Sequence, residues 1–536
     1  MNWWQTGVIY QIYPRSFYDS NQDGIGDIQG IIQKIPYFKK LGIDILWLSP
    51  IFVSPNDDFG YDITDYINID REYGTMEDFD ELIATAHQQN IKILIDGVFN
   101  HTSIKHPWFL DALEGRKRDW YHFCSQPNNW TSAFGGGAWT YLKDQNLYYL
   151  HTFLPSQADL NWAHPPVQNA ILDVMHFWLE RGVDGFRLDV FNCYHKDINY
   201  SNNPVRWNAL SVFARPFYPY LSYVHLYCRD QPQMFQTLLD MRNLCDSYNA
   251  VLLGETLDEQ LHYDNASQYC GANKLHMAFH FRWLHSKWNA VAFRNAICAW
   301  MDSLPTDGWP SWVVGNHDFV RHSSRWKGRN AKETEQKMKI IAVILLTLRG
   351  TPILYYGEEI GMQERPMKRH EIQDPVGKRY WPFFQGRDGA RTPMQWTAEG
   401  GFTNHHTTWI PYGNLCTSVE QQQKEPQSIW NHYKILLSLR KRLKPLCLGT
   451  MNGPFVSENN KNILYFERRF STQTIVIIVN MSPQSSHRIL LSKSDGEILF
   501  SCGDVLQFDQ FIQIGFLSTF LFETRTASQI NIQDLV

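Results

Sequence analysis

The sequence lacks three features that would mark other classes of protein: a long apolar run, a cluster of basic residues and closely paired cysteines. Its longest apolar stretches, such as residues 340–348, are too short to span a bilayer. No run of Lys and Arg stands out, and the formal net charge is −5, which does not suit a nucleic-acid partner. We therefore expect a globular protein with neither membrane nor nucleic acid as a partner.

Cysteine usage and the N-terminal residues both bear on the compartment. The nine cysteines are an odd number without Cys-x-x-Cys spacing, which is typical of free thiols in a reducing compartment. Residues 1–5 do not form a charged segment followed by an apolar one, so we expect no secretory signal. We predict a cytoplasmic protein, and the sequence leaves the oligomeric state open.

Apolar and aromatic residues, by contrast, are abundant. Apolar residues make up 43% of 536 residues, which is enough for a large core and more than one domain. Aromatic residues reach 15%, and aromatic faces also stack on sugar rings, although a large core accounts for most of them.

Strand-like and helix-like segments alternate along most of the chain. Helical patterns cover residues such as 30–41, 76–89, 167–181 and 429–442. The expected strands are residues 8–13, 43–48, 91–98, 185–189, 250–254, 277–281, 312–315 and 352–356. Eight such units predict an α/β fold, a closed (β/α)8 TIM barrel.

Three stretches interrupt or follow this alternation. Residues 101–166 are rich in Trp, Asn, Gly and His and predict a subdomain inserted after the third strand. Residues 361–412 are irregular, and residues 446–536 predict an all-β sandwich domain with strands near 463–468 and 474–479. The barrel itself would comprise residues 1–100 and 167–445.

Three acidic residues, Asp189, Glu255 and Asp318, stand at or just after the ends of different expected strands. A barrel builds a glycoside-cleaving site in this way, with one carboxylate as nucleophile and one protonated carboxyl as acid. Taken singly, each has a structural alternative: a strand-end ion pair for Asp189, a helix cap for Glu255 and an N-cap for Asp318.

Neighbouring residues suit this chemistry. Arg187 lies two residues before Asp189 on a strand, so both face one side and the arginine favours the ionised aspartate. Glu255, close to other carboxylates, is expected to have the raised pKa of a general acid. His101 follows the third strand and could donate to a sugar hydroxyl, although a histidine there is often structural.

Together with four further segments, these residues make the chain resemble the α-amylase family of glycoside hydrolases. The similarity is to its α-glucosidase and oligo-1,6-glucosidase branch, and it runs from Trp3 into the C-terminal β region. The further segments are residues 11–17, 60–63 and 391–396, and residues 157–161, which match a Gln-Pro-Asp-Leu-Asn motif except at Ala158.

The resemblance implies roles for individual residues. Asp189 would be the nucleophile, Glu255 the acid/base and Asp318 the stabiliser of the transition state. His101, Arg187 and His317 would hold the glucosyl unit. The remaining residues of the implied substrate pocket are Asp58 and Tyr61 at its closed end, Phe134 on its wall, Val190 beside the leaving group, and Arg391, with Arg387 close by.

Residues 19–27 predict a metal loop. Acidic or amide side chains recur at every second position, as in loops that wrap a hard cation. The start resembles an EF-hand loop, but its twelfth position is Gly30 instead of Glu. An unmetallated loop of Asx turns is the alternative. In the branch that the chain resembles, such a loop holds one structural Ca²⁺ or Mg²⁺, which implies the ligands Asp19, Asn21, Asp23, the Ile25 carbonyl and Asp27, and no organic cofactor.

The resemblance implies a retaining, exo-acting α-glucosidase that releases α-glucose from the non-reducing end of short oligosaccharides of the maltose or isomaltose type. A transglucosidase, a sucrose isomerase or a trehalose-6-phosphate hydrolase on the same scaffold stays open. A non-catalytic transporter heavy chain is a further alternative, disfavoured because the three carboxylates are present. In the branch that the chain resembles, valine at the position of Val190 goes with α-1,6 links, whereas residues 191–204 are similar to those of α-1,4-acting enzymes, so we expect activity on both linkages.

Overall fold

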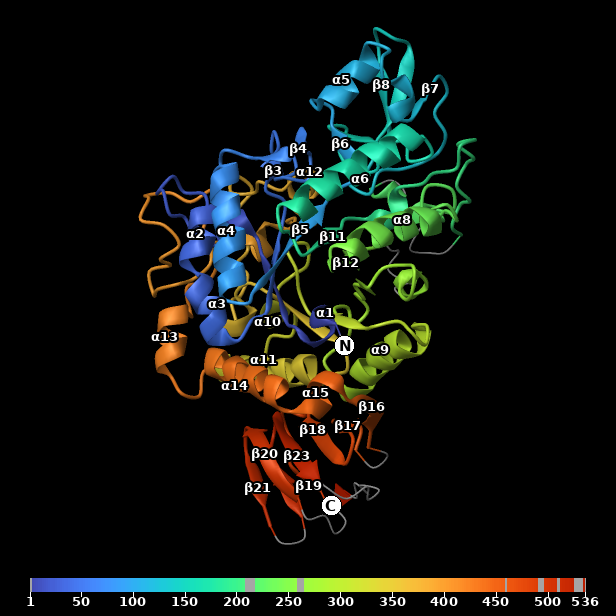
Figure 1. The fold of residues 1–536 in the computed structure, drawn as a ribbon. Coiled ribbons are helices and arrows are strands. Elements are labelled where there is room, and N and C mark those ends of the chain that lie inside the picture. Colours follow the sequence, from blue (N-terminus) through green and yellow to red (C-terminus); the bar gives the residue numbers. More distant parts are fainter. Residues whose placement is uncertain are drawn as a thin grey trace.

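Eight parallel strands form a barrel at the centre of the molecule (Figure 1). The computed structural model describes residues 2–207, 217–257, 265–457, 460–489, 496–508, 511–524 and 534–535. The barrel strands are β1 (Ile9–Ile12), β2 (Ile45–Leu48), β5 (Lys92–Gly97), β11 (Gly185–Leu188), β12 (Val251–Gly254), β13 (Met277–Ala278), β14 (Ser311–Val313) and β15 (Thr351–Tyr355). They pair in the order β13-β12-β11-β5-β2-β1-β15-β14. Between β13 and β14 no pairing occurs among the described residues, and all other neighbouring strands of the ring are paired. This arrangement of eight parallel strands confirms the predicted barrel.

Side-chain alternation explains why these strands close into a ring. In β2, Ile45 and Trp47 belong to a cluster inside the barrel, whereas Leu46 and Leu48 belong to the layer that packs on the helices. Successive residues of a strand point to opposite faces, so an apolar run serves both layers at once. β13 is shorter than the predicted 277–281 because its pairing with β12 ends at Ala278.

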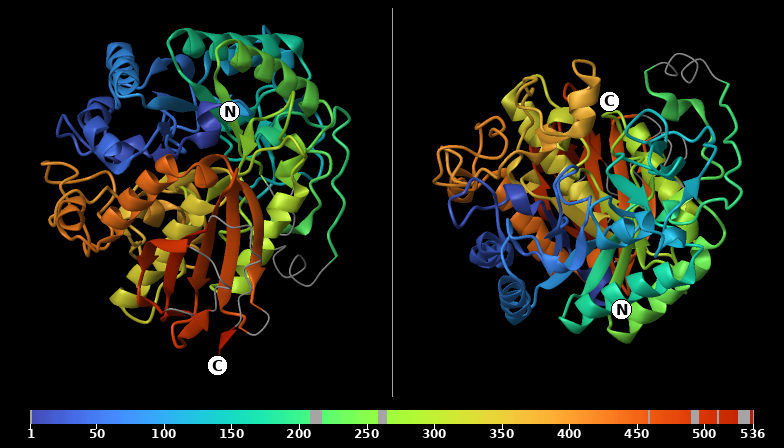
Figure 2. Two further views of the ribbon diagram at one scale, coloured as in Figure 1. Left: turned by 60° about the horizontal axis from the view of Figure 1, so that its bottom comes forward. Right: turned by 90° about the horizontal axis from the view of Figure 1, so that it is seen from above.

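Helices surround the barrel as an outer layer (Figures 1 and 2). The longer ones are α4 (Met76–Gln88), α6 (Pro165–Glu180), α8 (Met234–Ser247), α9 (Ala290–Ser303), α11 (Ala331–Thr347) and α14 (Ile429–Arg442). The single helix expected over 30–41 is instead two, α2 (Ile28–Gln33) and α3 (Ile35–Leu41). Pro36 has no N–H to donate to the preceding turn, which accounts for the break. Of the helices that the structure describes, none combines the length and apolarity needed to cross a bilayer.

The stretch 101–166 is more regular than its sequence indicates. Short strands pair as β6 (His101–Ser103) with β10 (Gln157–Asp159), and as the sheet β7 (Phe123–Cys124), β9 (Leu147–Leu150) and β8 (Trp139–Leu142). Helix α5 (Pro107–Leu113) covers them. The group stands at the end of the molecule opposite the C-terminal sheets (Figure 1). Strands of two to four residues are too short to show a period of two in the sequence.

Two antiparallel sheets form the C-terminal region (Figure 2). The first contains β16 (Thr450–Val456), β17 (Ile463–Phe470), β18 (Gln473–Asn480), β23 (Ser518–Thr524) and β20 (Gly496–Cys502), and the second β21 (Val505–Gln507), β22 (Ile512–Ile514), β19 (His487–Ile489) and β24 (Asp534–Leu535). Ile463, Val476 and Ile478 of the first sheet pack on Ile489 and Ile514 of the second, as in a β sandwich. The three domain boundaries given above stay predictions.

Candidate active site

A cavity of about 320 Å³ opens at the carboxyl ends of the barrel strands, and most of the predicted site residues line it. Those that do are Asp58, Tyr61, His101, Phe134, Asp189, Val190, Glu255, His317 and Asp318. Arg187 and Arg391 are fully buried behind the wall. The carboxyl end of a barrel is where this fold carries its chemistry.

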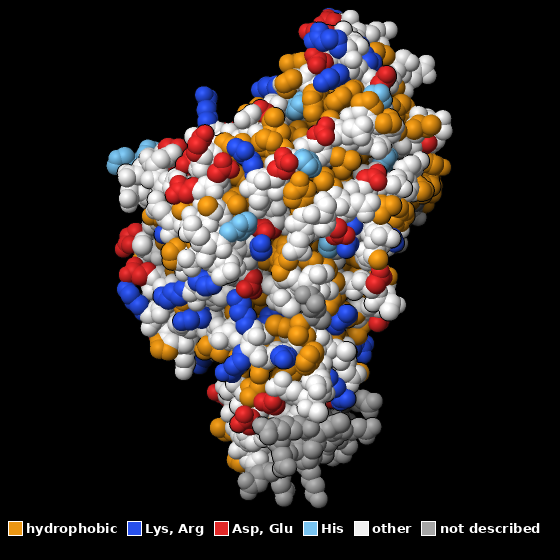
Figure 3. All heavy atoms as spheres, in the orientation of Figure 1, with side chains coloured by type: hydrophobic (Ala, Val, Ile, Leu, Met, Phe, Trp, Pro, Cys, Tyr) orange, Lys and Arg blue, Asp and Glu red, His pale blue; other side chains and the backbone are white. Residues whose placement is uncertain are grey.

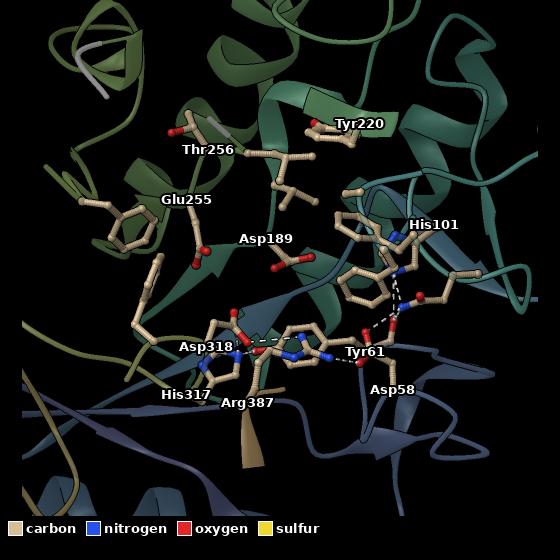
Figure 4. A pocket seen from close by; sticks show the side chains of 18 of the residues that line it. Asp58, Tyr61, His101, Asp189, Tyr220, Glu255, Thr256, His317, Asp318 and Arg387 are labelled. Carbon is tan, nitrogen blue, oxygen red and sulfur yellow. Dashed lines mark hydrogen bonds and ion pairs between the residues drawn. The ribbon is translucent and has the colours of Figure 1, made fainter. Parts of the chain in front are cut away.

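Strand register brings Asp189 and Glu255 together. Leu188 of β11 pairs with Gly254 of β12, so the residues that follow, Asp189 and Glu255, emerge side by side. The Glu255 amide donates to the Leu188 carbonyl at 2.9 Å and fixes that register. Asp318 follows β14 and faces the two from across the cavity (Figure 4).

Arg187 joins the two neighbouring carboxyls from behind. Its Nη1 donates to Asp189 Oδ1 at 2.8 Å and to Asp96 Oδ1 at 3.3 Å, and its Nη2 forms an ion pair with Glu255. Burial raises the pKa of Asp189, and the guanidinium of Arg187 opposes that rise. Burial also raises the pKa of Asp96 to about 7. The single buried guanidinium of Arg187 thus contacts three acidic side chains.

A chain of hydrogen bonds fixes the protonation of His317. Gln11 Nε2 donates to His317 Nδ1 at 2.8 Å, so the ring proton is on Nε2, which lies 2.7 Å from the Tyr61 hydroxyl. Tyr61 in turn donates to Asp96 Oδ2 at 2.8 Å. Burial lowers the pKa of His317 to about 3, so its ring is neutral near pH 7. The single N–H of the uncharged His317 ring is therefore donated to the Tyr61 hydroxyl.

Two arginines keep Asp318 ionised. Arg391 Nη2 donates to Asp318 Oδ1 at 2.9 Å, and Arg387 Nη1 approaches the same oxygen at 3.3 Å. Burial favours the protonated form of Asp318, but the nearby His317 and these two guanidinium groups outweigh it and hold its pKa well below the usual range. Because His317 is neutral near pH 7, the two arginines supply the positive charge there.

An ion pair joins two of the residues that line the cavity, Asp58 and Arg387. Arg387 Nη2 lies 2.7 Å from Asp58 Oδ1 and 2.7 Å from Asp374 Oδ1, and Gln157 Nε2 donates to the other oxygen of Asp58 at 3.2 Å. Figure 4 shows Asp58 on the far side of the site from Glu255, with Arg387 between Asp58 and Asp318. Together these contacts fix the positions of Asp58 and Arg387 in the cavity wall.

The structure brings in residues that the sequence did not single out. Arg387, and not the predicted Arg391, lines the cavity, while Arg391 donates to the His317 carbonyl at 3.0 Å from behind. The two lie four residues apart in a segment with little regular structure, so spacing could not distinguish them. Gln157 stands in a motif segment that could have indicated it. The other additional lining residues are Ala133, Phe153, Tyr218, Tyr220, Leu221, Thr256, Leu257, Phe281, His285 and Phe319.

Val190, directly after Asp189, has a strained backbone. Its φ is +36° and ψ +40°, in the left-handed region that β-branched residues rarely adopt. A residue keeps such a strained conformation only where its contacts with the rest of the structure hold it there, which is often the case at functional sites. The conformation directs Val190 into the cavity wall beside Asp189.

The predicted metal loop forms a series of Asx turns. Asp19 accepts from the Gln22 and Gly24 amides at 2.7 and 2.8 Å, Asn21 from the Asp23 amide at 3.0 Å, and Asp23 from the Ile25 amide at 2.8 Å. Asp27 caps α2 by accepting from the Gly30 amide at 2.6 Å. Within the described parts of the chain, no three His, Cys, Asp or Glu side chains are grouped closely enough to hold a metal ion.

Comparisons with known proteins agree with this geometry. The family model described as alpha amylase, catalytic domain, matches residues 11–449. A probable alpha-glucosidase of Rhizobium meliloti is 40% identical over 511 residues, 92% of each chain, and an oligo-1,6-glucosidase of Parageobacillus thermoglucosidasius is 34% identical over 96% of this chain and 97% of its own. The crystal structure of an alpha-glucosyl transfer enzyme, XgtA, superposes with a TM-score of 0.89 at 35% identity, covering 98% of this chain and 100% of its own. The chain belongs to the α-amylase family of glycoside hydrolases.

Proposed function

We propose that the protein is a retaining, exo-acting α-glucosidase for short α-glucosides. The observation that carries the proposal is the pair Asp189 and Glu255, held side by side at the ends of adjacent strands in a cavity that the ion pair Asp58–Arg387 also lines. Retaining enzymes need two carboxyls roughly 5 Å apart, whereas inverting enzymes need room for a water between them. Arg187, which contacts Asp189 through Nη1 and Glu255 through Nη2, supports the closer arrangement. The similarity to α-glucosidases and oligo-1,6-glucosidases supports the same substrate class.

Two steps complete the reaction. In the first, the Asp189 carboxylate attacks the anomeric carbon and forms an ester, while Glu255 gives its proton to the departing oxygen as the glycosidic bond breaks. In the second, Glu255 takes a proton from water, the hydroxide attacks the anomeric carbon, and the bond to Asp189 breaks. The sugar keeps its α-configuration, and the two carboxyls do this chemistry without an organic cofactor.

The other side chains bind and orient the glucosyl unit. Asp318, held ionised by Arg387 and Arg391, can accept from sugar hydroxyls and steady the positive charge that develops on the ring. His101 and His317 line the same cavity as Asp189 and Asp318 and would contact the glucosyl unit there. The ion pair Asp58–Arg387 then admits only a non-reducing end, which leads to release of one glucose at a time.

The test is the anomer formed first from maltose and isomaltose, followed by NMR before mutarotation. Retention predicts α-glucose as the first product. Asp189→Asn and Glu255→Gln should each lower kcat by orders of magnitude while leaving the unfolding temperature close to that of the wild type. Formation of β-glucose first would exclude the double displacement.

Transfer of the glucosyl unit to an alcohol other than water is a second candidate function. The likeness to XgtA, an alpha-glucosyl transfer enzyme, favours it. The first step is unchanged, and in the second Glu255 takes the proton of the acceptor hydroxyl instead of that of water. The ratio of transfer products to free glucose at high maltose concentration measures how far this activity competes with hydrolysis.

We also propose that residues 19–27 bind one structural Ca²⁺ or Mg²⁺. The loop offers the oxygen ligands that hard cations prefer: side-chain oxygens of Asp19, Asn21, Asp23 and Asp27 and the Ile25 carbonyl. A carboxylate oxygen that already accepts one N–H retains a lone pair for a cation. The loop lines no part of the active-site cavity, so the ion would stabilise the fold and take no part in the reaction.

A cytoplasmic location is the last part of the proposal. All nine cysteines are free thiols, which fits a reducing compartment. Figure 3 shows acidic and basic side chains interspersed over the face in view. Fractionation of cells that produce the protein tests the location directly.

A further inference from the structure

The loop that carries His317 and Asp318 has no regular secondary structure of its own. It begins after β14, which ends at Val313, and runs to the short helix α10 (His322–Arg325). Figure 4 shows His317 and Asp318 together at the edge of the cavity. Inside the loop, the Asp318 amide donates to Asn316 Oδ1 at 2.8 Å. Because neither a helix nor a sheet fixes this loop, its shape depends on side chains that bind its backbone.

Arg325, the last residue of α10, binds both ends of the loop. Its Nη2 donates to the Val314 carbonyl, and its Nη1 donates to the Val320 carbonyl at 2.7 Å. The five residues 315–319 lie between these two carbonyls, and Asp318 is one of them. A guanidinium is planar and holds its N–H groups in fixed directions. One side chain therefore sets how far apart the two ends of the loop lie.

Arg325 is itself held in place from outside the loop. Its guanidinium carbon lies 4.6 Å from the ring centroid of Trp326, and Trp326 is buried and donates its Nε1 to the Ser286 carbonyl at 2.9 Å. Burial lowers the pKa of Arg325 to about 10, so the group is still charged at neutral pH. A charged donor forms a stronger hydrogen bond to a carbonyl than a neutral one. Neither Arg325 nor Trp326 lines the active-site cavity.

The support that Arg325 gives differs from that of the two arginines in the site. Arg387 and Arg391 contact the carboxylate of Asp318 and supply positive charge to it. Arg325 instead contacts the backbone on both sides of Asp318, through Val314 and Val320. The first kind of contact sets the ionisation of the carboxylate, and the second sets where the loop places it.

We propose that Arg325 is a positioning residue for Asp318, which holds the loop so that the Asp318 carboxylate meets the charge developing on the sugar ring. The inference rests on the proposed function, in which Asp318 stabilises the transition state. An interaction that strengthens as this charge develops contributes to kcat more than to substrate binding. Displacement of the loop should therefore lower kcat and leave KM little changed.

The test compares Arg325→Ala and Arg325→Lys with the wild type, with maltose as substrate. Since a misplacement of about 1 Å can cost roughly a hundredfold in rate, we expect Arg325→Ala to lower kcat at least about tenfold. A lysine ammonium cannot span both carbonyls as the guanidinium does, so Arg325→Lys should have an intermediate kcat. Added guanidinium ion should restore part of the kcat of Arg325→Ala. If Arg325→Ala does not fold, Arg325→Lys alone decides the result.

Two control variants separate positioning from stability. Arg440→Lys alters another arginine that donates to two carbonyls, those of Leu346 and Leu446, away from the cavity. It should lower the unfolding temperature and keep the kcat of the wild type. Arg329→Ala alters a side chain that is 64% exposed, and it should match the wild type with and without guanidinium ion.

Three outcomes would overturn the inference. A wild-type kcat in folded Arg325→Ala or Arg325→Lys, when Asp318→Asn has lost activity, would remove the role of Arg325 and leave the proposed function intact. A kcat that falls equally in Arg440→Lys would show an effect of stability alone. An Asp318→Asn variant that keeps the kcat of the wild type would overturn the proposed role of Asp318 and this inference with it.

Discussion

Arg187 offers a sharp test of how the active site works. It is fully buried and touches three acidic side chains, Asp96, Asp189 and Glu255. Removing one partner of a buried ion pair costs about 3–5 kcal/mol, a large part of the roughly 5–15 kcal/mol that stabilises a typical domain. Arg187→Leu is therefore expected to unfold readily, and Arg187→Lys is the variant to assay.

The expected effect on activity follows from the charge. Burial raises the pKa of Asp189 and Arg187 opposes that rise, so losing the guanidinium should raise this pKa further. Asp189 must be ionised to attack, so activity falls as pH falls through its pKa. Arg187→Lys keeps a positive charge but cannot form the same fork to Asp189 and Glu255. We expect its acid limb of kcat/KM to move to higher pH, by less than complete loss of the positive charge would cause.

The assay is kcat/KM for maltose from pH 4 to 9, with unfolding temperatures measured over the same range. Arg440→Lys is the matched control, because Arg440 is also fully buried but donates to the carbonyls of Leu346 and Leu446, away from the cavity. It should lower the unfolding temperature and leave the pH profile in place. An acid limb that does not move in folded Arg187→Lys, or that moves equally in Arg440→Lys, would refute the electrostatic role.

Three further predictions address the closed end, the loop and the linkage. Arg387→Ala removes a partner of Asp58 and should raise KM for maltose more than it lowers kcat; an unchanged KM would contradict a closed end. Excess chelator should lower the unfolding temperature more than the activity at room temperature, with recovery on adding Ca²⁺ or Mg²⁺; an unaltered unfolding temperature, with no metal by elemental analysis, would remove the site at residues 19–27. Val190→Ala should lower kcat/KM for isomaltose relative to maltose; if the ratio does not change, residues 191–204 are the better candidates for the selector.

The barrel could be predicted from the sequence because each strand is a short apolar run that is buried on both faces. The run at residues 43–48 differs from β2 (Ile45–Leu48) by two residues. The positions of the three carboxylates at strand ends could be predicted for a related reason. The end of a strand is marked by a change from apolar to polar residues, and the carboxyl ends of parallel strands all lie on the same side of the sheet.

The wall of the cavity could not be predicted in the same way. Tyr218 and Leu257 lie in loops, and their contact with Val190 depends on how those loops fold over the barrel. The position of Arg387 depends on Asp58, which lies 329 residues earlier in the chain, and on Asp374, which lies 13 residues earlier. No local period carries information about such pairs, since both members lie outside regular strands and helices or at their ends.

Glycines in the active-site segments have a structural reason that the sequence alone does not give. A Cβ at Gly254 would lie 2.4 Å from Leu275 Cδ1 and 2.6 Å from Phe191 Cε1, so only glycine lets the end of β12 pack there. That packing and the pairing of Gly254 with Leu188 set the register of β12 against β11. A shift of one residue would turn Glu255 to the opposite face of the barrel wall, away from Asp189. The stereochemical outcome that we propose for the reaction thus depends on the pairing register of two strands, and Gly254 helps to fix that register.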